Sequence, residues 1–377
     1  MNGRAEKTRR LVLIMVVSAM AALTGCGGFF VPVVPVPPSS TGNYVYVANS
    51  ATNTVSGFAL TTGKLINVPN SPVALGFAPL AMVVTPNNKF LYVAASGTIS
   101  VYTINSDGSL TNPAVVTIAN VVSMDISPDG QWLLALDSTP LVAQIDQFQI
   151  NASTGALAAA APTPFSIPNA AIVPTMLRVS PNGSLVFASL GTAGDLTYNF
   201  DTTTGALFNS QQLSAVNATS DNGLAVDSAT TKLYIARSGA AGGVAVYNIG
   251  TAGALSPVRG SPFASGGQAY AVALDSTGKY AYAANRSDGT IYGYSIATSG
   301  GLAPLSGSPY KSGAQVTSLG IDSSGKYLLA AAFGGGPDLS MYSFDAANPG
   351  NLILASSTAT GTDPTGALAV ALTHLAQ

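Results

Sequence analysis

A unit of three short apolar segments, each closed by a turn, recurs along this chain of 377 residues. Its clearest copy spans residues 271–302 and reads AVALDSTGKYAYAANRSDGTIYGYSIATSGGL. Runs of about 5–7 β-branched and aromatic residues between clusters of Gly, Asn, Asp and Ser are typical of strands joined by tight turns. A chain built from such units is restricted to folds in which one supersecondary motif repeats.

Three sequence markers measure the repeat. A polar turn follows the first apolar segment at intervals of 42 to 53 residues, and a Gly-x-Leu turn recurs at intervals of 45 to 50 residues. An aromatic residue lies near the end of the third segment. The polar turns begin at Thr85, Ser127, Ser180, Asp227, Asp275 and Asp322; the aromatic residues are Phe58, Tyr102, Phe148, Phe200, Tyr247, Tyr294 and Tyr342; the glycines are Gly63, Gly108, Gly155, Gly205, Gly253, Gly300 and Gly350. The last two markers occur seven times each.

The first unit is split between the two ends of the chain. Residues 44–49 (YVYVAN) match the second strand of the unit, whereas residues 366–372 (GALAVAL) match its first strand. The C-terminal strand can therefore complete the N-terminal repeat and close a ring, whereas an open solenoid would need polar capping units. Four-stranded repeats of about 45–50 residues in a closed ring are propeller blades. We predict an all-β fold over residues 43–377, a seven-bladed β-propeller of four-stranded blades.

The repeat motifs resemble those of a known family. YVAN at residues 46–49, YVAA at 92–95 and YAAN at 282–285 resemble the YVTN-type repeat, and SPF at 261–263 and SPY at 308–310 form a further shared element. With the polar and Gly-x-Leu turns, they resemble the lactonase family of seven-bladed β-propellers typified by 6-phosphogluconolactonase. The resemblance implies the propeller fold and, as an activity, the hydrolysis of a sugar-acid lactone.

Residues 1–25 have the pattern of a bacterial export signal. Four basic residues precede an apolar run over residues 11–23, which leads into the sequence LTGC. A basic start, a short apolar core and small residues before a cleavage point are typical of a secretory signal, not of a membrane-spanning helix. The LTGC ending resembles a lipobox, which would make Cys26 the lipidated first residue of the mature protein. The alternative is an ordinary signal peptide in which Cys26 is accidental.

Residues 26–42 are expected to form a tether between the membrane and the propeller. They contain the proline-rich stretch FFVPVVPVPPSS, a composition that favours an extended, semi-rigid spacer. Gly27 follows the cysteine where an aspartate would favour inner-membrane retention, so an outer-membrane anchor is expected, facing the periplasm or the surface. Cys26 is the only cysteine, so the propeller contains no internal disulfide.

Two charged residues interrupt an otherwise apolar position of the first strands. Two residues before each polar turn, or before its equivalent Thr373, the chain carries Val83, Asp125, Arg178, Ala225, Ala273, Gly320 and Ala371. Asp125 and Arg178 occupy this position in consecutive blades, so they are expected to meet near the central channel. A buried charge is costly unless it is paired. Two interpretations stay open: a structural salt bridge between blades, or a site for an anionic or polar ligand.

The supply of acid and base groups is small. Glu6 is the only glutamate and lies in the export signal. His374 is the only histidine and is the fourth residue from the C-terminal end. The lactonase resemblance implies a histidine at the start of a first strand and a glutamate after a second strand. The corresponding positions here hold Ala81, Ser123, Met176, Gly223, Ala271, Ser318 and Ala369, and then Ser50, Ser96, Ser138, Arg237 and Arg286. Asp125 and Arg178 remain as candidate catalytic residues, and His374 is expected to be an exposed terminal residue.

The remaining polar features predict little chemistry. Asp227, Asp275 and Asp322 open turns in which an aspartate normally hydrogen-bonds its own backbone, with calcium binding as the alternative. Arg237 and Arg286 follow second strands in adjacent blades and could form a basic patch for a ligand or partner, or stay solvated in loops. Beyond residue 25, fifteen aspartates oppose ten lysines and arginines, a net charge of −5 that disfavours nucleic acid. No metal and no cofactor is predicted.

The sequence therefore favours a lipid-anchored, non-catalytic binding or interaction module in the cell envelope. Its propeller domain is expected to be monomeric, its anchor to be Cys26, and its partner to be an envelope protein or a glycan. The alternative is a lactonase-family hydrolase of a sugar-acid lactone with a non-standard site at Asp125 and Arg178.

Overall fold

The computed structural model describes residues 42–138, 143–165, 171–360 and 366–374. These residues form β-strands joined by turns, together with one 3-10 turn, η1 (Thr251–Gly253). None of the helical structure in the described residues is long and apolar enough to span a bilayer. The expected export signal (residues 1–25), the lipidation site Cys26 and the tether up to residue 41 lie outside the described residues.

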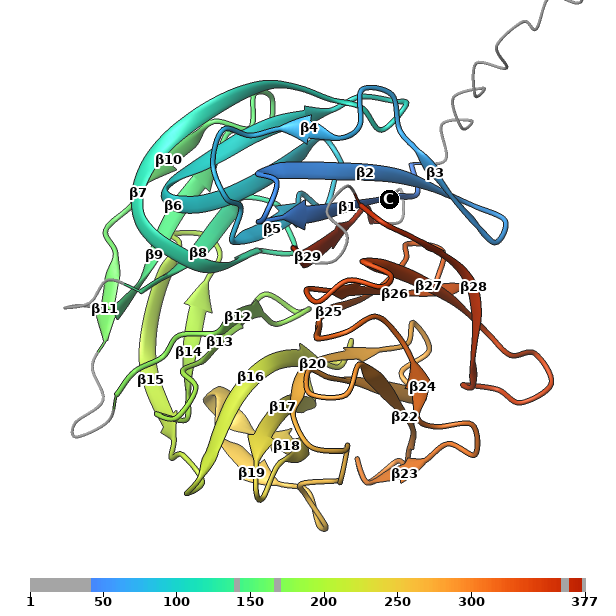
Figure 1. The fold of residues 1–377 in the computed structure, drawn as a ribbon. Coiled ribbons are helices and arrows are strands. Elements are labelled where there is room, and N and C mark those ends of the chain that lie inside the picture. Colours follow the sequence, from blue (N-terminus) through green and yellow to red (C-terminus); the bar gives the residue numbers. More distant parts are fainter. Residues whose placement is uncertain (1–41, 139–142, 166–170, 361–365, 375–377) are drawn as a thin grey trace, which may run out of the picture. The chain divides into compact units, whose positions relative to one another are not determined.

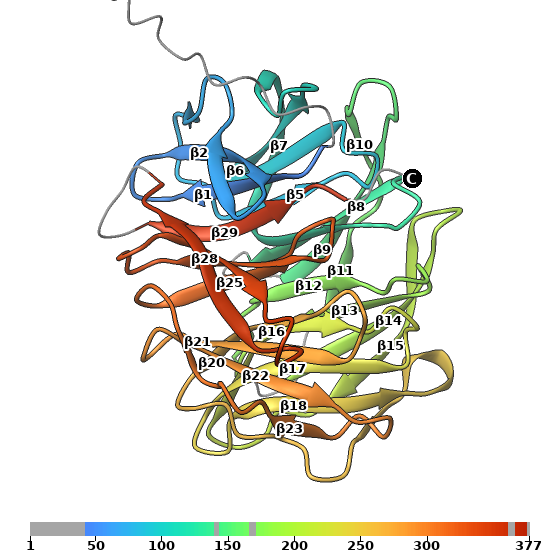
Figure 2. The same ribbon diagram turned by 90° about the vertical axis from the view of Figure 1, so that its right-hand side faces the viewer.

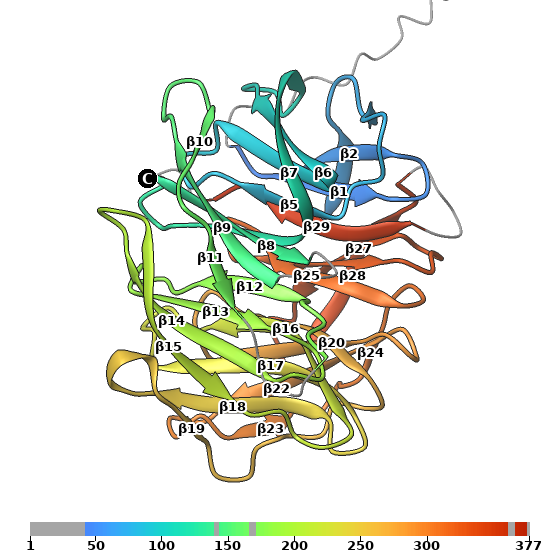
Figure 3. The same ribbon diagram turned by 90° about the vertical axis from the view of Figure 1, so that its left-hand side faces the viewer.

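The strands form antiparallel sheets arranged around a central channel, as Figure 1 shows from one end of the channel. The first blade combines the two ends of the described chain in the order β29 (Ala367–Leu372), β1 (Tyr44–Asn49), β2 (Thr54–Thr61) and β3 (Lys64–Asn67), with β4 (Val73–Ala74) beside β2. In Figures 2 and 3, which view the same strands from two sides, β29 lies beside β1.

Blades two and three share one continuous sheet. Its strands are β5 (Ala81–Val84), β6 (Phe90–Ile104), β7 (Leu110–Ile126), β8 (Trp132–Ser138), β9 (Ala143–Ile150), β10 (Leu157–Ala159) and β11 (Thr163–Phe165). β6 turns back on itself at Gly97, and its two halves run side by side, with Ile104 N donating to Lys89 O at 2.9 Å. β7 pairs with β6 along its first half and with β8 along its second half, so it leads directly from one blade into the next.

The other four blades are separate sheets. Blade four holds β12 (Met176–Val179), β13 (Leu185–Ser189), β14 (Asp195–Asp201) and β15 (Ala206–Leu213); blade five holds β16 (Thr219–Val226), β17 (Lys232–Gly239), β18 (Gly243–Ile249) and β19 (Leu255–Pro257). Blade six holds β20 (Ala269–Leu274), β21 (Tyr280–Asn285), β22 (Thr290–Ile296), β23 (Leu302–Pro304) and β24 (Tyr310–Lys311); blade seven holds β25 (Val316–Ile321), β26 (Tyr327–Ala332), β27 (Leu339–Phe344) and β28 (Leu352–Thr358). The all-β, seven-bladed prediction is confirmed.

Ring closure also follows the prediction from the split first repeat. β29 pairs antiparallel with β1, with Tyr46 opposite Ala371. Beyond the strand, Tyr44 N donates to Thr373 Oγ1 at 2.8 Å. The two ends of the described chain are thus held in one sheet, which leaves no unpaired first strand in the ring.

The recurring tyrosine of the YVAN-type motif explains how blades are joined. The hydroxyl of Tyr46 donates to Gly108 O at 2.8 Å, that of Tyr92 to Gly155 O at 2.8 Å, and that of Tyr282 to Gly350 O at 2.6 Å. Each acceptor is the Gly-x-Leu turn of the following blade. All three tyrosines are fully buried, so each phenol needs such a partner.

The polar turns are held by their own first residue. Asp275 accepts hydrogen bonds from the backbone N–H of Lys279 and Tyr280 at 2.9 and 2.7 Å, and Asp322 accepts them from Lys326 and Tyr327 at 2.8 and 2.6 Å. Asp227 does the same for Thr231 and Lys232 at 2.6 and 2.8 Å. The expectation that these aspartates bind their own turns is confirmed. These turns fix where each first strand ends at the channel.

Candidate ligand site in the central channel

The first strands of the blades line the channel with one face. The positions two and four residues before the polar turn lie on that face because side chains alternate along a strand. The residues lining it at these positions are Ala81, Val83, Ser123, Asp125, Met176, Arg178, Ala225, Ala273, Ser318, Gly320, Ala369 and Ala371. Small and aliphatic side chains dominate, and the wall encloses two cavities of about 470 and 320 Å³ that share Asp125 and Arg178.

Most wall side chains that carry a polar or sulfur atom accept a hydrogen bond from the next blade. The donors are backbone N–H groups of the neighbouring first strand. The bonds run from Leu177 N to Ser123 Oγ (3.0 Å), from Leu224 N to Met176 Sδ (3.0 Å), and from Val370 N to Ser318 Oγ (3.2 Å). The wall therefore joins the blades at the axis, where the first strands come closest.

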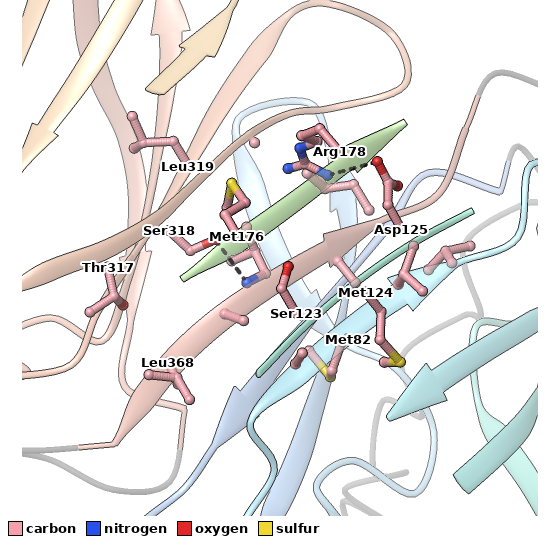
Figure 4. Close-up of a pocket in the computed structure, with 18 of the residues that line it drawn as sticks. Met82, Ser123, Met124, Asp125, Met176, Arg178, Thr317, Ser318, Leu319 and Leu368 are labelled. Atoms are coloured by element: carbon pink, nitrogen blue, oxygen red, sulfur yellow. Dashed lines mark hydrogen bonds and ion pairs between the residues drawn. The ribbon is translucent and has the colours of Figure 1, made fainter. Parts of the chain in front are cut away.

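Asp125 and Arg178 meet at this wall, as their shared strand position predicted (Figure 4). Arg178 Nη1 lies 3.6 Å from Asp125 Oδ2, and the side chains are 39% and 15% exposed. Asp125 Oδ2 also accepts Val179 N at 2.9 Å, and its Oδ1 accepts Ile126 N at 3.0 Å. Both carboxylate oxygens are thus bound to backbone, one of them across the blade junction.

The guanidinium of Arg178 is less constrained than its partner. Within the described residues its one hydrogen bond is from Nε to Leu224 O, at a long 3.4 Å. A guanidinium carries five N–H donors. Arg178 therefore presents unused donors and a positive charge to the channel, whereas each oxygen of Asp125 already accepts a backbone N–H.

His374 lies at the mouth of the larger cavity. Its side chain is exposed, as expected for a residue near the chain end, but its position is defined. His374 N donates to Asn88 Oδ1 at 2.6 Å, and its Nε2 lies 3.1 Å from Val84 O. In the described residues no group of three or more His, Cys, Asp or Glu side chains has the arrangement of a metal site.

The prediction that Arg237 forms a basic patch with Arg286 is wrong. Arg237 lies inside β17 at the place of the motif asparagine, equivalent to Asn285, and it is 2% exposed. Arg286 lies one residue further along its repeat, beyond β21, and its guanidinium stacks on the ring of Tyr270 at 4.9 Å. A shift of one residue moves a side chain to the other face of a strand, so the two arginines have different environments.

Sequence reasoning missed a buried charge cluster between blades four and five. Arg237 Nε and Nη2 donate to Asp221 Oδ1 and Oδ2 at 2.5 and 2.8 Å. Asp195, 2% exposed, lies beside this pair, and neither of its oxygens meets a donor among the described residues. Burial, and then the charge of Asp221, raises the pKa of Asp195 well above its usual value.

A signal for this cluster was present in the register. The residue ten positions after the start of a polar turn is buried near the end of the second strand. In three of the blades this residue is polar or charged: Asp137, Arg237 and Asn285. Asp195 does not occupy this position: it opens the third strand of blade four, and the tenth residue from the polar turn in that blade is the apolar Leu190. Its contact with Asp221 could not be found from the repeat.

The fold and its channel define the class of protein, a seven-bladed β-propeller. The family model described as "Lactonase, 7-bladed beta-propeller" matches residues 192–310 and 228–369. This match confirms the resemblance to the lactonase family that the repeat motifs indicated. None of the curated proteins is significantly similar to the chain.

Solved structures agree on the fold. A putative 6-phosphogluconolactonase from Bacteroides fragilis aligns with a TM-score of 0.71 at 17% identity, over 89% of this chain and 99% of its own. The periplasmic gluconolactonase of Pseudomonas aeruginosa aligns with a TM-score of 0.73 at 16% identity, over 88% and 99%. Kuenenia stuttgartiensis hydrazine synthase also aligns, with a TM-score of 0.63 at 17% identity, over 81% and 93%. At such identities the likeness establishes the fold alone, since one propeller fold serves several chemistries.

Proposed function

We propose that this protein is an exported, lipid-anchored propeller that binds a ligand or partner in the cell envelope without catalysing a reaction. The observation that carries the proposal is the state of Asp125. Both of its oxygens accept backbone N–H groups, so it is occupied as a structural acceptor at the place where a general base would act. No glutamate follows residue 25, and His374 is the chain's one histidine.

The export signal, the lipid at Cys26 and the proline-rich tether form the second part of the proposal. Their support is the sequence of residues 1–42, with its basic start, apolar run and LTGC ending. In a Gram-negative host, Cys26→Ala is expected to move the protein from the membrane fraction to the soluble fraction. Recovery of the variant in the membrane, at the wild-type level, would contradict a lipid anchor.

A lactonase-family hydrolase is the second candidate. It is favoured by the match to the family model and by the position of Asp125 and Arg178, which border both channel cavities. In that case Arg178 would stabilise the developing oxyanion of a lactone carbonyl, and Asp125 would assist the attacking water.

Hydrolysis of a panel of lactones, sugar-acid lactones included, separates the two candidates. We expect the purified protein to give no turnover above the uncatalysed rate. Turnover that disappears in Asp125→Ala, with the variant folded by circular dichroism, would establish the hydrolase. Turnover that persists in Asp125→Ala and Arg178→Ala would contradict both the non-catalytic proposal and this particular site.

A further inference from the structure

We propose that the channel binds an amphipathic organic monocarboxylate, with its carboxylate on Arg178 and its apolar part along the small residues of the wall. This inference rests on the proposed binding function and names the chemical class of its ligand. The juxtaposition that carries it is one cation with unused donors, set in a wall of alanine, valine and methionine side chains.

Arg178 is the anchor because it differs from every other polar side chain of the wall. Ser123, Ser318 and Asp125 each accept a backbone N–H from the neighbouring blade, so their acceptors are satisfied inside the protein. Arg178 makes one long hydrogen bond within the described residues and is 39% exposed toward the channel. A planar guanidinium with free N–H groups matches the two oxygens of a carboxylate.

Asp125 reduces this attraction but leaves donors of Arg178 free. Its side chain is 15% exposed, and its oxygens accept hydrogen bonds from Val179 N and Ile126 N, which partly offset its negative charge. The pair as a whole is neutral, however, which makes the site suited to one negative charge and unsuited to a phosphate dianion. A monocarboxylate is therefore the anion that the arrangement favours.

The apolar part of the ligand has a matching surface. Met176 lies two residues before Arg178 on the same strand face (Figure 4), and the wall continues through Ala369 and Ala371 on β29 and Val83 on β5. The larger cavity, at about 470 Å³, falls in the range of sites for small molecules, which are mostly apolar with a few polar groups that fix orientation. Thioether side chains adapt to differently shaped apolar groups.

Calorimetric titration with phenylbutyrate tests the proposal, with the full-length protein in lipid nanodiscs and empty nanodiscs subtracted. The matched alcohol, phenylbutanol, tests the need for the charge, and inorganic phosphate tests the preference for a monocarboxylate. We expect phenylbutyrate to bind at least about tenfold more tightly than phenylbutanol, the factor expected for one charge-assisted hydrogen-bonded contact. Phosphate is expected to give no saturable signal.

Three variants locate the binding. Arg178→Ala is expected to weaken phenylbutyrate about 10- to 100-fold and to leave phenylbutanol unchanged. Asp125→Asn, which removes the opposing charge, is expected to strengthen phenylbutyrate. Arg259→Ala, an exposed arginine outside the channel, is the control and should bind as wild type does. If Arg178→Ala does not fold, Ala369→Phe, which narrows the larger cavity that Arg178 also lines, takes its place and should weaken phenylbutyrate.

Equal affinity for phenylbutyrate and phenylbutanol overturns the inference, as does unchanged binding in folded Arg178→Ala or the absence of binding by either probe. These outcomes leave the proposed non-catalytic function intact. Lactone turnover that depends on Asp125 would instead overturn the function, whatever the titrations give, so the two failures can be told apart.

Discussion

Two Asp–Arg pairs occur in this propeller, one across a blade junction and one within a blade, and they differ in burial and in geometry. The pair between blades three and four, Asp125 and Arg178, is 3.6 Å apart with an arginine that is 39% exposed. The pair within blade five, Asp221 on β16 and Arg237 on β17, has both side chains 2% exposed and two hydrogen bonds of 2.5 and 2.8 Å. The first pair borders both channel cavities, whereas neither residue of the second pair lines them.

The difference shows how burial decides what a pair of charges can do. A buried arginine with both its hydrogen bonds made is part of the packing, and removing one partner leaves the other charged in a medium of low dielectric. Burial alone would lower the pKa of Arg237, but its hydrogen bonds to Asp221 raise it. A half-exposed arginine keeps most of its hydration and contributes little to stability. The same residue types are thus structural within blade five and available for binding at the junction of blades three and four.

Removing the buried arginine should have the largest effect. Arg237→Ala leaves Asp221 unpaired beside Asp195, and we expect the free energy of unfolding to fall by about 3–5 kcal/mol. Urea unfolding followed by circular dichroism measures the loss. The double variant Asp221→Leu, Arg237→Met, which removes both charges, should recover much of it. A loss below about 1 kcal/mol in Arg237→Ala would contradict the contrast between the pairs.

The third member of the buried cluster should make stability depend on pH. Because the pKa of Asp195 is raised in the folded protein, its protonated form is favoured by folding. Its contribution is complete below the carboxyl pKa of the unfolded chain and is lost as pH rises toward the folded value, by about 1.4 kcal/mol for each pH unit of that range. Asp195→Asn should remove this loss, so it should stabilise the protein most at the upper end of that pH range.

Urea midpoints measured between pH 4 and pH 8 test this expectation. Asp146 contributes a similar slope, since burial, and then Asp137, raises its pKa to about 6. Asp146→Asn is therefore needed beside Asp195→Asn, and it should remove the part of the slope that ends near pH 6. Asp201, whose pKa is lowered by hydrogen bonds from Thr204 and Thr203, is the control. A wild-type slope unchanged in Asp195→Asn would contradict the raised pKa of Asp195.

At the channel, removing the side chain of Asp125 should lower the free energy of unfolding more than removing that of Arg178. Asp125→Ala removes the acceptor of Val179 N across the blade junction and that of Ile126 N, so we expect a loss of about 1–3 kcal/mol in unfolding free energy. Ser123→Ala is the matched control, because Ser123 lies two residues before Asp125 and its hydroxyl accepts Leu177 N across the same junction. This variant should lose less unfolding free energy because the hydroxyl is uncharged. An Asp125→Ala variant as stable as wild type would show that the carboxylate is not structural.

The smallest effect on stability is expected for Arg178→Ala. Its long hydrogen bond and distant ion pair should contribute less than about 1 kcal/mol, and added salt should reduce even that. Urea unfolding at low and high ionic strength measures this loss and its dependence on salt. A loss as large as that of Arg237→Ala would mean that both arginines are structural, and the ligand proposed for the channel would lose its anchor.

The repeat spacing alone determined the architecture of this protein. Strand alternation and the recurrence of turns are local periodicities, so the number of blades, the closing role of residues 367–372 and the meeting of Asp125 with Arg178 could all be derived from positions in the chain. That last contact was predictable because both residues occupy the same step of consecutive repeats. Their environment was also set by the register, since that step faces the channel.

Tertiary structure decided the roles of the charges. Arg237 was placed beside Arg286 by sequence, but a one-residue difference in register buries the first against Asp221 and leaves the second on Tyr270. Asp195 meets Asp221 although the two occupy unrelated steps of their repeats. Contacts of this kind depend on the offset between neighbouring blades and on which side chains pack at the end of each second strand. These are properties of packing, because they arise from side-chain volumes and strand offsets that no single repeat contains.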